Sequence, residues 1–407
     1  METRTLHRPE SEHDACGVGF VADLRGRRSR DLVEDALLVL QRLAHRGAVG
    51  ADPDTGDGAG ILLELPHALL GAELAACHKV LPAEGRYALA MLFLDGDQTI
   101  AAVRRIVEAR GFDVLHTRNV PVNAEAAGKQ ARRCAPRAVQ LLLVPRDRAH
   151  VGRQLFVARR AIEKAGAAYV CSMSTRTVVY KGLLKPDQLR GYYADLESLE
   201  MRSGFAIVHQ RFSTNTSSTW RRAQPFRHLA HNGEINTLQG NLNRMGAREP
   251  QMAAPWLDPD TITPVLDGSD SDSANLDRAL ELLLHTGRSL PHAAAMLLPE
   301  AWEGSRTLSA AQRSFWAWHA AVMEPWDGPA CAVFTDGLRV GAALDRNGLR
   351  PARWTLTRSG RVLLASEAGV LDLPGRAIRR RGRLGPGQQL LIDPTRGRLL
   401  LDQQIKG

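Results

Sequence analysis

The spacing of hydrophobic and polar residues predicts both strands and helices along this chain. Small and apolar residues fill positions 16–22, which predicts a strand that begins in a buried sheet. Apolar residues then recur at helical spacing across 31–44, and Gly47 is expected to end that helix. By the same criteria, further strands are predicted at 87–94, 139–144, 168–172, 177–180, 205–209 and 330–335, and further helices at 151–165, 273–285 and 308–323.

The connections between these elements indicate the fold class. Several consecutive predicted strands are joined by short turns with no crossover helix, for example between Ser172 and Thr177. Because short turns suit antiparallel neighbours, an α+β layering fits better than a doubly wound parallel sheet. The last stretch, 373–407, is rich in glycine, proline and arginine, with a short apolar run at 389–392, and it predicts a terminal strand followed by a tail.

Composition narrows the class of protein. The chain has 407 residues, of which 44% are hydrophobic, enough for a large buried core. No apolar run is long enough to span a membrane, and residues 1–14 lack the apolar centre of a signal peptide, so we expect a cytoplasmic protein without a membrane partner. The five cysteines are scattered without a C-x-x-C pair, which supports neither a disulfide framework nor a zinc or iron–sulfur site.

The net charge of +9 raises the question of an acidic partner. Two short basic clusters occur, at 25–30 and 379–383. Neither is interleaved with aromatic residues, so we interpret both as solvated surface and expect no nucleic-acid partner. The rival hypothesis, a nucleic-acid-binding protein, predicts binding that weakens steeply with salt and ignores amino acids.

Cys16 is the residue whose position suggests chemistry. Removal of residues 1–15 would leave a thiol and a free α-amine on one residue. Such an amine has a pKa of about 8 and can relay the thiol proton, so the nucleophile and its base would share one residue. The ordinary alternative is a small buried hydrophobic residue at the start of a strand.

Two further segments offer groups that such a nucleophile needs. Arg211 directly follows a predicted strand, and its guanidinium suits a substrate carboxylate. Asn232 and Gly233 provide adjacent donors for the oxyanion of an acyl-transfer intermediate. Asn-Gly is also a common two-residue hairpin turn, so that interpretation stays open.

An acidic, serine-rich segment precedes the predicted helix 273–285. Either Asp270 or Asp272 could hold a substrate ammonium, whereas the structural alternative is helix capping by Asp272 or Ser273. The glycine-rich segment 56–60 lacks the Lys-Ser/Thr ending of a phosphate-binding loop. A self-sufficient nucleophile, an oxyanion site, a carboxylate clamp and an ammonium clamp together suit an amidase that acts on an α-amino acid.

These motifs resemble those of class II glutamine amidotransferases, whose nucleophile is an N-terminal cysteine, and specifically the glutaminase domain of the glutamate synthase large subunit. The resemblance extends over residues 16–392. It rests on strings that appear in the family's order: CGVGF at 16–20, HRG at 45–47, GDGAGI at 56–61, QRFSTNT at 210–216, AQPFR at 223–227, HNGEINT at 231–237, EPWDGPA at 324–330 and DRNGLRP at 345–351.

The resemblance implies a fold and a mechanism. The fold would be a four-layer αββα sandwich of the N-terminal-nucleophile hydrolase type, with two antiparallel sheets and Cys16 at the start of a central strand. After loss of the leader 1–15, Cys16 would attack the side-chain amide of L-glutamine, and Asn232 and Gly233 would stabilise the oxyanion.

The resemblance also implies how the substrate is held. Arg211 would bind the α-carboxylate of glutamine, and the aspartate of the Ser-Asp-Ser motif its α-ammonium. Here Asp270 and Asp272 both match that motif, and the number of residues before the following Leu-Asp pair at 276–277 favours Asp272. Arg46, in the string at 45–47, is expected among the substrate-binding residues.

The implied partner is a separate enzyme. Glutamate synthase large subunits continue into a synthase barrel that holds FMN and an iron–sulfur cluster, whereas this sequence is expected to comprise a glutaminase domain at 16–392 and a tail at 393–407, with no cofactor of its own. A separate synthase subunit would then accept the ammonia. Two alternatives remain: a non-catalytic glutamine-binding regulatory subunit, or an amidotransferase subunit of another synthase, such as N-methylglutamate synthase.

Overall fold

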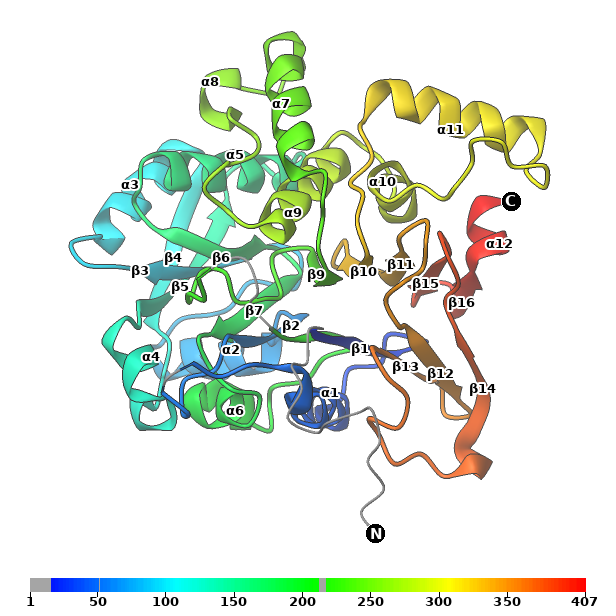
Figure 1. Cartoon of the computed structure of the whole chain (residues 1–407). Coiled ribbons are helices and arrows are strands. Elements are labelled where there is room, and N and C mark those ends of the chain that lie inside the picture. The colour runs from blue at the N-terminus through cyan, green and yellow to red at the C-terminus, as the bar shows by residue number, and fades with distance from the viewer. Residues whose placement is uncertain (1–15, 51, 212–216) are drawn as a thin grey trace.

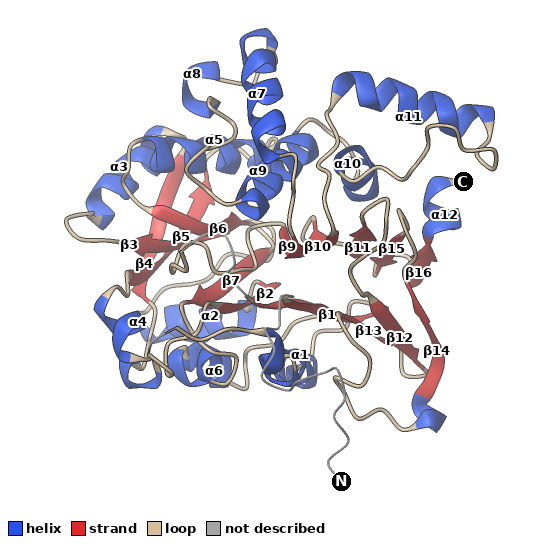
Figure 2. Ribbon diagram, in the orientation of Figure 1, coloured by secondary structure: helices blue, strands red, loops and turns tan. Residues whose placement is uncertain are grey.

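Two layers of antiparallel sheet lie between two layers of helices (Figure 1, Figure 2). The computed structural model describes residues 16–50, 52–211 and 217–407. The helices below the sheets in Figure 1 are α1 (Arg30–Arg42), α2 (His67–Ala76), α4 (Lys129–Arg133) and α6 (Gln188–Tyr192). Those above are α3 (Ile100–Ala109), α5 (Val151–Lys164), α7 (Leu238–Arg248), α8 (Pro259–Ile262), α9 (Asp272–His285), α10 (Leu290–Leu297) and α11 (Ala310–Val322). The four-layer α+β sandwich is confirmed.

The lower layer is one sheet, whose strands within the described residues run in the order β14-β12-β13-β1-β8-β2-β7. Their bounds are β1 (Gly17–Asp23), β2 (Ala59–Glu64), β7 (Thr177–Gly182), β8 (Phe205–Gln210), β12 (Arg353–Thr357), β13 (Arg361–Ala365) and β14 (Ile378–Arg383). Each neighbouring pair is antiparallel. β1 and β8 therefore lie at the centre of this sheet.

The upper layer consists of two sheets, which corrects the expectation of one. In the described part of the chain, one has the order β16-β15-β11-β10-β9 and the other β4-β5-β3-β6. The strands are β3 (Ala88–Leu94), β4 (Phe112–Asn119), β5 (Arg137–Pro145), β6 (Tyr169–Ser174), β9 (Leu229–Gly233), β10 (Ala330–Thr335), β11 (Val340–Leu344), β15 (Gln389–Asp393) and β16 (Arg398–Leu401). The segment that leads into β9 lies beside β6, where Tyr169 donates its hydroxyl to the carbonyl of Arg221 (2.9 Å).

The elements predicted from apolar periodicity are present, with ends that agree to within two residues. β14 was not predicted, because its sequence, IRRRGR, has no apolar alternation and forms an exposed edge strand. The expected tail at 393–407 is also corrected. It forms β16, which pairs with β15, and then the short helix α12 (Asp402–Lys406).

Close packing of β1 on α1 determines where Cys16 lies. Along β1, Val18 and Phe20 face the upper sheet, so the alternate residues, Gly17 and Gly19, face the opposite side. A Cβ added at Gly17 would lie 2.8 Å from the Cβ of Leu43, closer than side chains pack. The glycine therefore lets the helix approach the strand just after the nucleophile.

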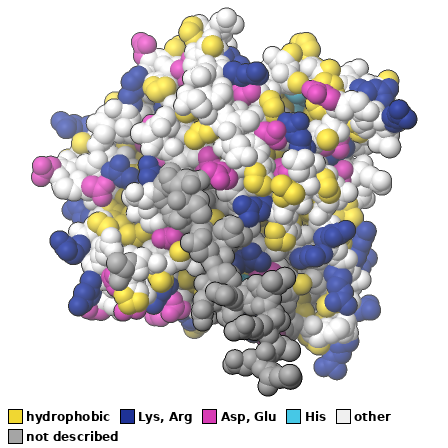
Figure 3. All heavy atoms as spheres, in the orientation of Figure 1, with side chains coloured by type: hydrophobic (Ala, Val, Ile, Leu, Met, Phe, Trp, Pro, Cys, Tyr) yellow, Lys and Arg dark blue, Asp and Glu magenta, His cyan; other side chains and the backbone are white. Residues whose placement is uncertain are grey.

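The two basic clusters have different surroundings. The side chains of 379–383 are largely exposed on β14, and Figure 3 shows Lys and Arg gathered on the side that carries β12 and β14. In the other cluster, Arg27 pairs with Asp23 (2.9 Å) and Arg28 with Glu84 (2.6 Å). The interpretation of both clusters as solvated surface is confirmed, since Arg25, Arg27 and Arg28 are exposed as well, and the cluster at 25–30 is in addition ion-paired.

Candidate active site

The pairing of β1 with β8 brings Cys16 and Arg211 together. Gly17 lies opposite Gln210 in this antiparallel pair, so the residues one step further, Cys16 and Arg211, lie opposite each other. Continued strand alternation directs both side chains toward the upper layer, on the side of Val18. Cys16 is half-buried, which differs from the buried hydrophobic residue considered as its alternative.

Arg211 is a buried cation at this end of the sheet. Its side chain is 6% exposed, and its backbone N–H donates to the carbonyl of Gly58 (2.9 Å), so β2 holds it in place. Burial lowers the pKa of Arg211, while the nearby Cys16, Asp57 and Asp272 act in the opposite direction. The guanidinium thus lies within electrostatic reach of the nucleophile and of two carboxylates.

Strand β9 carries the predicted oxyanion donors across from β1. β9 packs over β1 and β8, and His209 donates from Nε2 to the carbonyl of His231 (3.0 Å), which joins the two layers. Asn232 is fully buried, with Nδ2 3.3 Å from Oγ of Ser366. That hydroxyl also accepts from the N–H of Val18 (3.1 Å), two residues after the nucleophile.

Gly233 occupies a backbone position that only glycine fits well. Its φ is +137°, and an added Cβ would lie 1.8 Å from the carbonyl oxygen of Pro329. The residue still belongs to β9 and pairs with Ala330 of β10. The hairpin-turn interpretation of Asn-Gly is therefore wrong, and the chain leaves the sheet only after Gly233.

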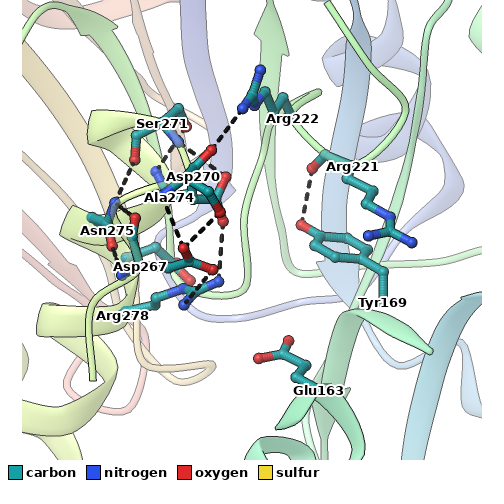
Figure 4. Close-up of polar contacts among 12 residues, drawn as sticks. Glu163, Tyr169, Arg221, Arg222, Asp267, Asp270, Ser271, Ala274, Asn275 and Arg278 are labelled. Atoms are coloured by element: carbon teal, nitrogen blue, oxygen red, sulfur yellow. Dashed lines mark hydrogen bonds and ion pairs between the residues drawn. The ribbon is translucent and has the colours of Figure 1, made fainter. Parts of the chain in front are cut away.

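The structure separates the two candidate aspartates. Asp272 is the first residue of α9, and its carboxylate accepts from the N–H of Ile235 (2.8 Å), just beyond β9. Asp270 instead forms an ion pair with Arg278 (3.0 Å), and Figure 4 shows these two side chains together. Ser271 caps the helix, so capping by Asp272 or Ser273 is corrected. Asp272 is thus the one beside β9.

Buried charges fasten α9 to β9. Asp277 of α9 accepts from the N–H groups of His228 (2.7 Å) and Leu229 (3.2 Å), where β9 begins. Arg227 pairs with Asp277 (2.8 Å) and lies 3.3 Å from Glu281. Burial alone would raise the pKa of Glu281, but Arg159 and Arg227 lower it to about 2. The helix that presents Asp272 is therefore held at both ends of β9.

The two histidines that connect the layers are poor candidates for a base. Burial lowers the pKa of His209 to about 3, and burial also lowers that of His231. Nε2 of His209 is already engaged by a backbone carbonyl. Both rings are therefore neutral near pH 7, and the layers are joined by the ring of His209 and the backbone carbonyl of His231.

Arg46 has a partner beside the site. Its Nε donates to Glu367 (2.7 Å), which is also 2.9 Å from Nε2 of His45. Glu367 follows Ser366, so this ion pair secures the chain next to the hydroxyl that contacts Asn232. A direct contact between Arg46 and a substrate stays a prediction.

Sequence reasoning missed Ser366. It lies just after β13, is 1% exposed, and has no motif of its own in the sequence. Its contacts with Val18 and Asn232 arise only because the fold brings β13, β1 and β9 close to one another. The string at 324–330 was recognised without a role. It supports the chain beyond β9, where the N–H of Asn236 donates to the carbonyl of Asp327 (2.8 Å).

Within the ranges that the structure describes, no group of three or more His, Cys, Asp or Glu side chains is arranged to hold a metal ion. In the same ranges, no helix has the length and apolar character needed to cross a membrane.

Comparison with known proteins defines the family. Residues 16–407 match the family of class II glutamine amidotransferases, and the chain belongs to it. It is 42% identical over 418 residues to the glutamate synthase [NADPH] large chain of Bacillus subtilis (strain 168), covering 98% of this chain and 27% of that protein. It is 44% identical over 410 residues to the ferredoxin-dependent glutamate synthase 2 of Synechocystis, covering 97% and 26%.

The chain spans about a quarter of the length of these relatives. Among solved structures, the glutamine phosphoribosylpyrophosphate amidotransferase of B. subtilis covers 93% of this chain at 15% identity, with a TM-score of 0.40 and 47% of that protein covered. The family membership rests on the sequence matches, and it makes this chain a class II glutamine amidotransferase.

Proposed function

We propose that this chain hydrolyses the side-chain amide of L-glutamine through a thioester on Cys16. The observation that carries the proposal is the β1–β8 register. It sets Cys16 opposite the buried Arg211. In β9, Nδ2 of Asn232 lies 3.3 Å from Oγ of Ser366, which also accepts from the N–H of Val18 in β1. A thiol, a guanidinium and a carboxamide from two facing sheets thus lie at one end of β1, which supports a reaction that needs a positioned nucleophile, cation and amide donor.

The proposed reaction has two stages. Once residues 1–15 are removed, the α-amine of Cys16 takes the thiol proton and the sulfur attacks the amide carbon of glutamine. The oxyanion that forms is stabilised by Asn232 and Gly233. The carbon–nitrogen bond then breaks, the amine returns the proton to the leaving ammonia, and water hydrolyses the thioester to glutamate and free thiol.

Substrate recognition would use opposite charges. Arg211 binds the α-carboxylate of glutamine and Asp272 its α-ammonium, and the electrostatic interaction between these two residues supports a site with both signs of charge. Two clamps on the α-carbon would distinguish glutamine from simple amides, which lack both charged groups.

The names of the relatives suggest the fate of the ammonia. Because they are glutamate synthases, we propose that this chain supplies ammonia to a glutamate synthase activity, in the cytoplasm. The glutamine chemistry described above uses side-chain and backbone groups of this chain. The FMN and iron–sulfur cluster expected from the resemblance would belong to the ammonia-accepting synthase.

The test combines mass and turnover. Intact mass and N-terminal sequencing of the purified chain are expected to show Cys16 as the first residue, and a coupled assay is expected to release ammonia and glutamate in equal amounts from glutamine. Cys16→Ala should abolish both leader removal and turnover, because one thiol performs both. Glutamine binding without hydrolysis by a chain that keeps residues 1–15 would instead establish a regulatory subunit.

A further inference from the structure

One buried hydroxyl connects three separate parts of the proposed site. Oγ of Ser366 accepts from the N–H of Val18 (3.1 Å) and lies 3.3 Å from Nδ2 of Asn232. It is also 3.5 Å from the carbonyl oxygen of Cys16 and 3.3 Å from that of Val18. Ser366 is 1% exposed, so no solvent competes for these contacts. The nucleophile's strand and the oxyanion donor therefore meet at one atom.

The two ends of the Asn232 amide have different surroundings. One end faces Ser366, whereas the other, Oδ1, is buried with no hydrogen-bond partner among the described residues. Nitrogen and oxygen of a carboxamide are close in size, so a half-turn of the amide exchanges them. After that half-turn, Oδ1 faces Ser366 and Nδ2 occupies the unpartnered position.

Only this exchanged orientation gives an oxyanion donor. A buried oxygen with no partner is unfavourable, and it would repel a developing negative charge. An N–H at the same position can donate to the oxyanion when it forms. The hydroxyl proton of Ser366 is then best directed at Oδ1, since the carbonyl of Val18 already accepts from the N–H of Ser366 (2.9 Å).

We infer that Ser366 is a positioning residue for the oxyanion donor: its hydroxyl donates to Oδ1 of Asn232 and so directs Nδ2 of that amide toward the tetrahedral intermediate. The N–H of Val18 donates to Oγ of Ser366, which fixes the direction of the hydroxyl. The ion pairs of Glu367 with Arg46 and His45 secure the following residue. This inference rests on the proposed glutaminase function.

The experiment compares Ser366→Ala with Asn232→Ala and the double variant by steady-state glutaminase kinetics. Loss of one oxyanion donor lowers kcat by about 100- to 1,000-fold, so a donor that has lost its positioning hydrogen bond should lower kcat by about tenfold or more. KM should change by less than about twofold, because the interaction is made in the transition state. In the Asn232→Ala background, Ser366→Ala should change kcat by less than about twofold, since the group it positions is gone.

A matched control separates positioning from strand stability. Ser203 is also fully buried, and its Oγ accepts from the N–H of Glu64 (3.1 Å) and donates to the carbonyl of Phe205 (2.5 Å), at the other end of β8. Ser203→Ala should lower the midpoint of thermal unfolding without changing kcat. Should Ser366→Ala not yield folded protein, Ser366→Thr and Ser366→Val offer an isosteric pair that differs only in the hydroxyl.

The possible outcomes test the positioning role of Ser366 and the proposed glutaminase function separately. A kcat for Ser366→Ala equal to that of an active wild type overturns the inference and leaves the proposed function intact, as does an effect fully additive with Asn232→Ala. A wild-type chain that begins at Cys16 and does not turn over glutamine overturns the proposed function itself. Recovery of kcat in Ser366→Thr but not in Ser366→Val supports the hydroxyl as the positioning group.

Discussion

Replacing Arg211 with alanine is the most direct test of the proposed carboxylate clamp. The guanidinium is 6% exposed at the end of β8, so a carboxylate that reaches it makes charge-assisted hydrogen bonds largely out of water. One such hydrogen bond contributes about 1.5–3 kcal/mol, which corresponds to about a 10- to 150-fold increase in KM when it is removed. Because the clamp holds ground state and transition state alike, kcat should change little.

The assay is glutamate release over a range of glutamine concentrations, with circular dichroism to establish folding. Arg211→Lys keeps a charge without the planar fork and should recover only part of the affinity. Arg222→Ala serves as the matched control, because Arg222 is a nearby cation that donates to the carbonyl of Ser269 (2.8 Å). An unchanged KM with a large drop in kcat for Arg211→Ala would refute the role assigned to Arg211.

Two further predictions follow from the surroundings of named groups. Asp272→Asn should raise KM for glutamine about tenfold or more, whereas Asp270→Asn, which removes an ion pair with Arg278, should leave KM unchanged; equal effects would contradict the assignment. His209 has a pKa of about 3 in the folded chain and about 6.5 when unfolded, so the unfolded state binds more protons below pH 6.5 and stability falls as pH decreases. Urea unfolding of His209→Asn should therefore show a pH slope smaller by about 1.2 kcal/mol per unit between pH 6 and 5, and an unchanged slope would contradict this account of His209.

Much of the site could be predicted from the sequence because it lies where regular elements end. Cys16 precedes a strand of small and apolar residues, and Arg211 follows another, so periodicity alone placed both at strand ends. Asn232 and Gly233 were predicted as donors through their motif, although β9 itself, with the sequence LAHNG, has too few apolar residues to stand out. Apolar alternation also failed for β14, where an exposed edge strand needs no apolar face.

The sequence by itself determined the layered α+β class, the chemical types of the proposed groups and the family, because these depend on periodicity and on residue strings. The tertiary structure decided which groups meet. Strand register set Cys16 opposite Arg211, and packing of α9 on β9 turned Asp272 toward the site and Asp270 toward Arg278. Ser366 lies about 350 positions from Cys16 in the chain, so no local pattern could reveal their contact. Long-range pairing, which depends on the whole core, brought them together.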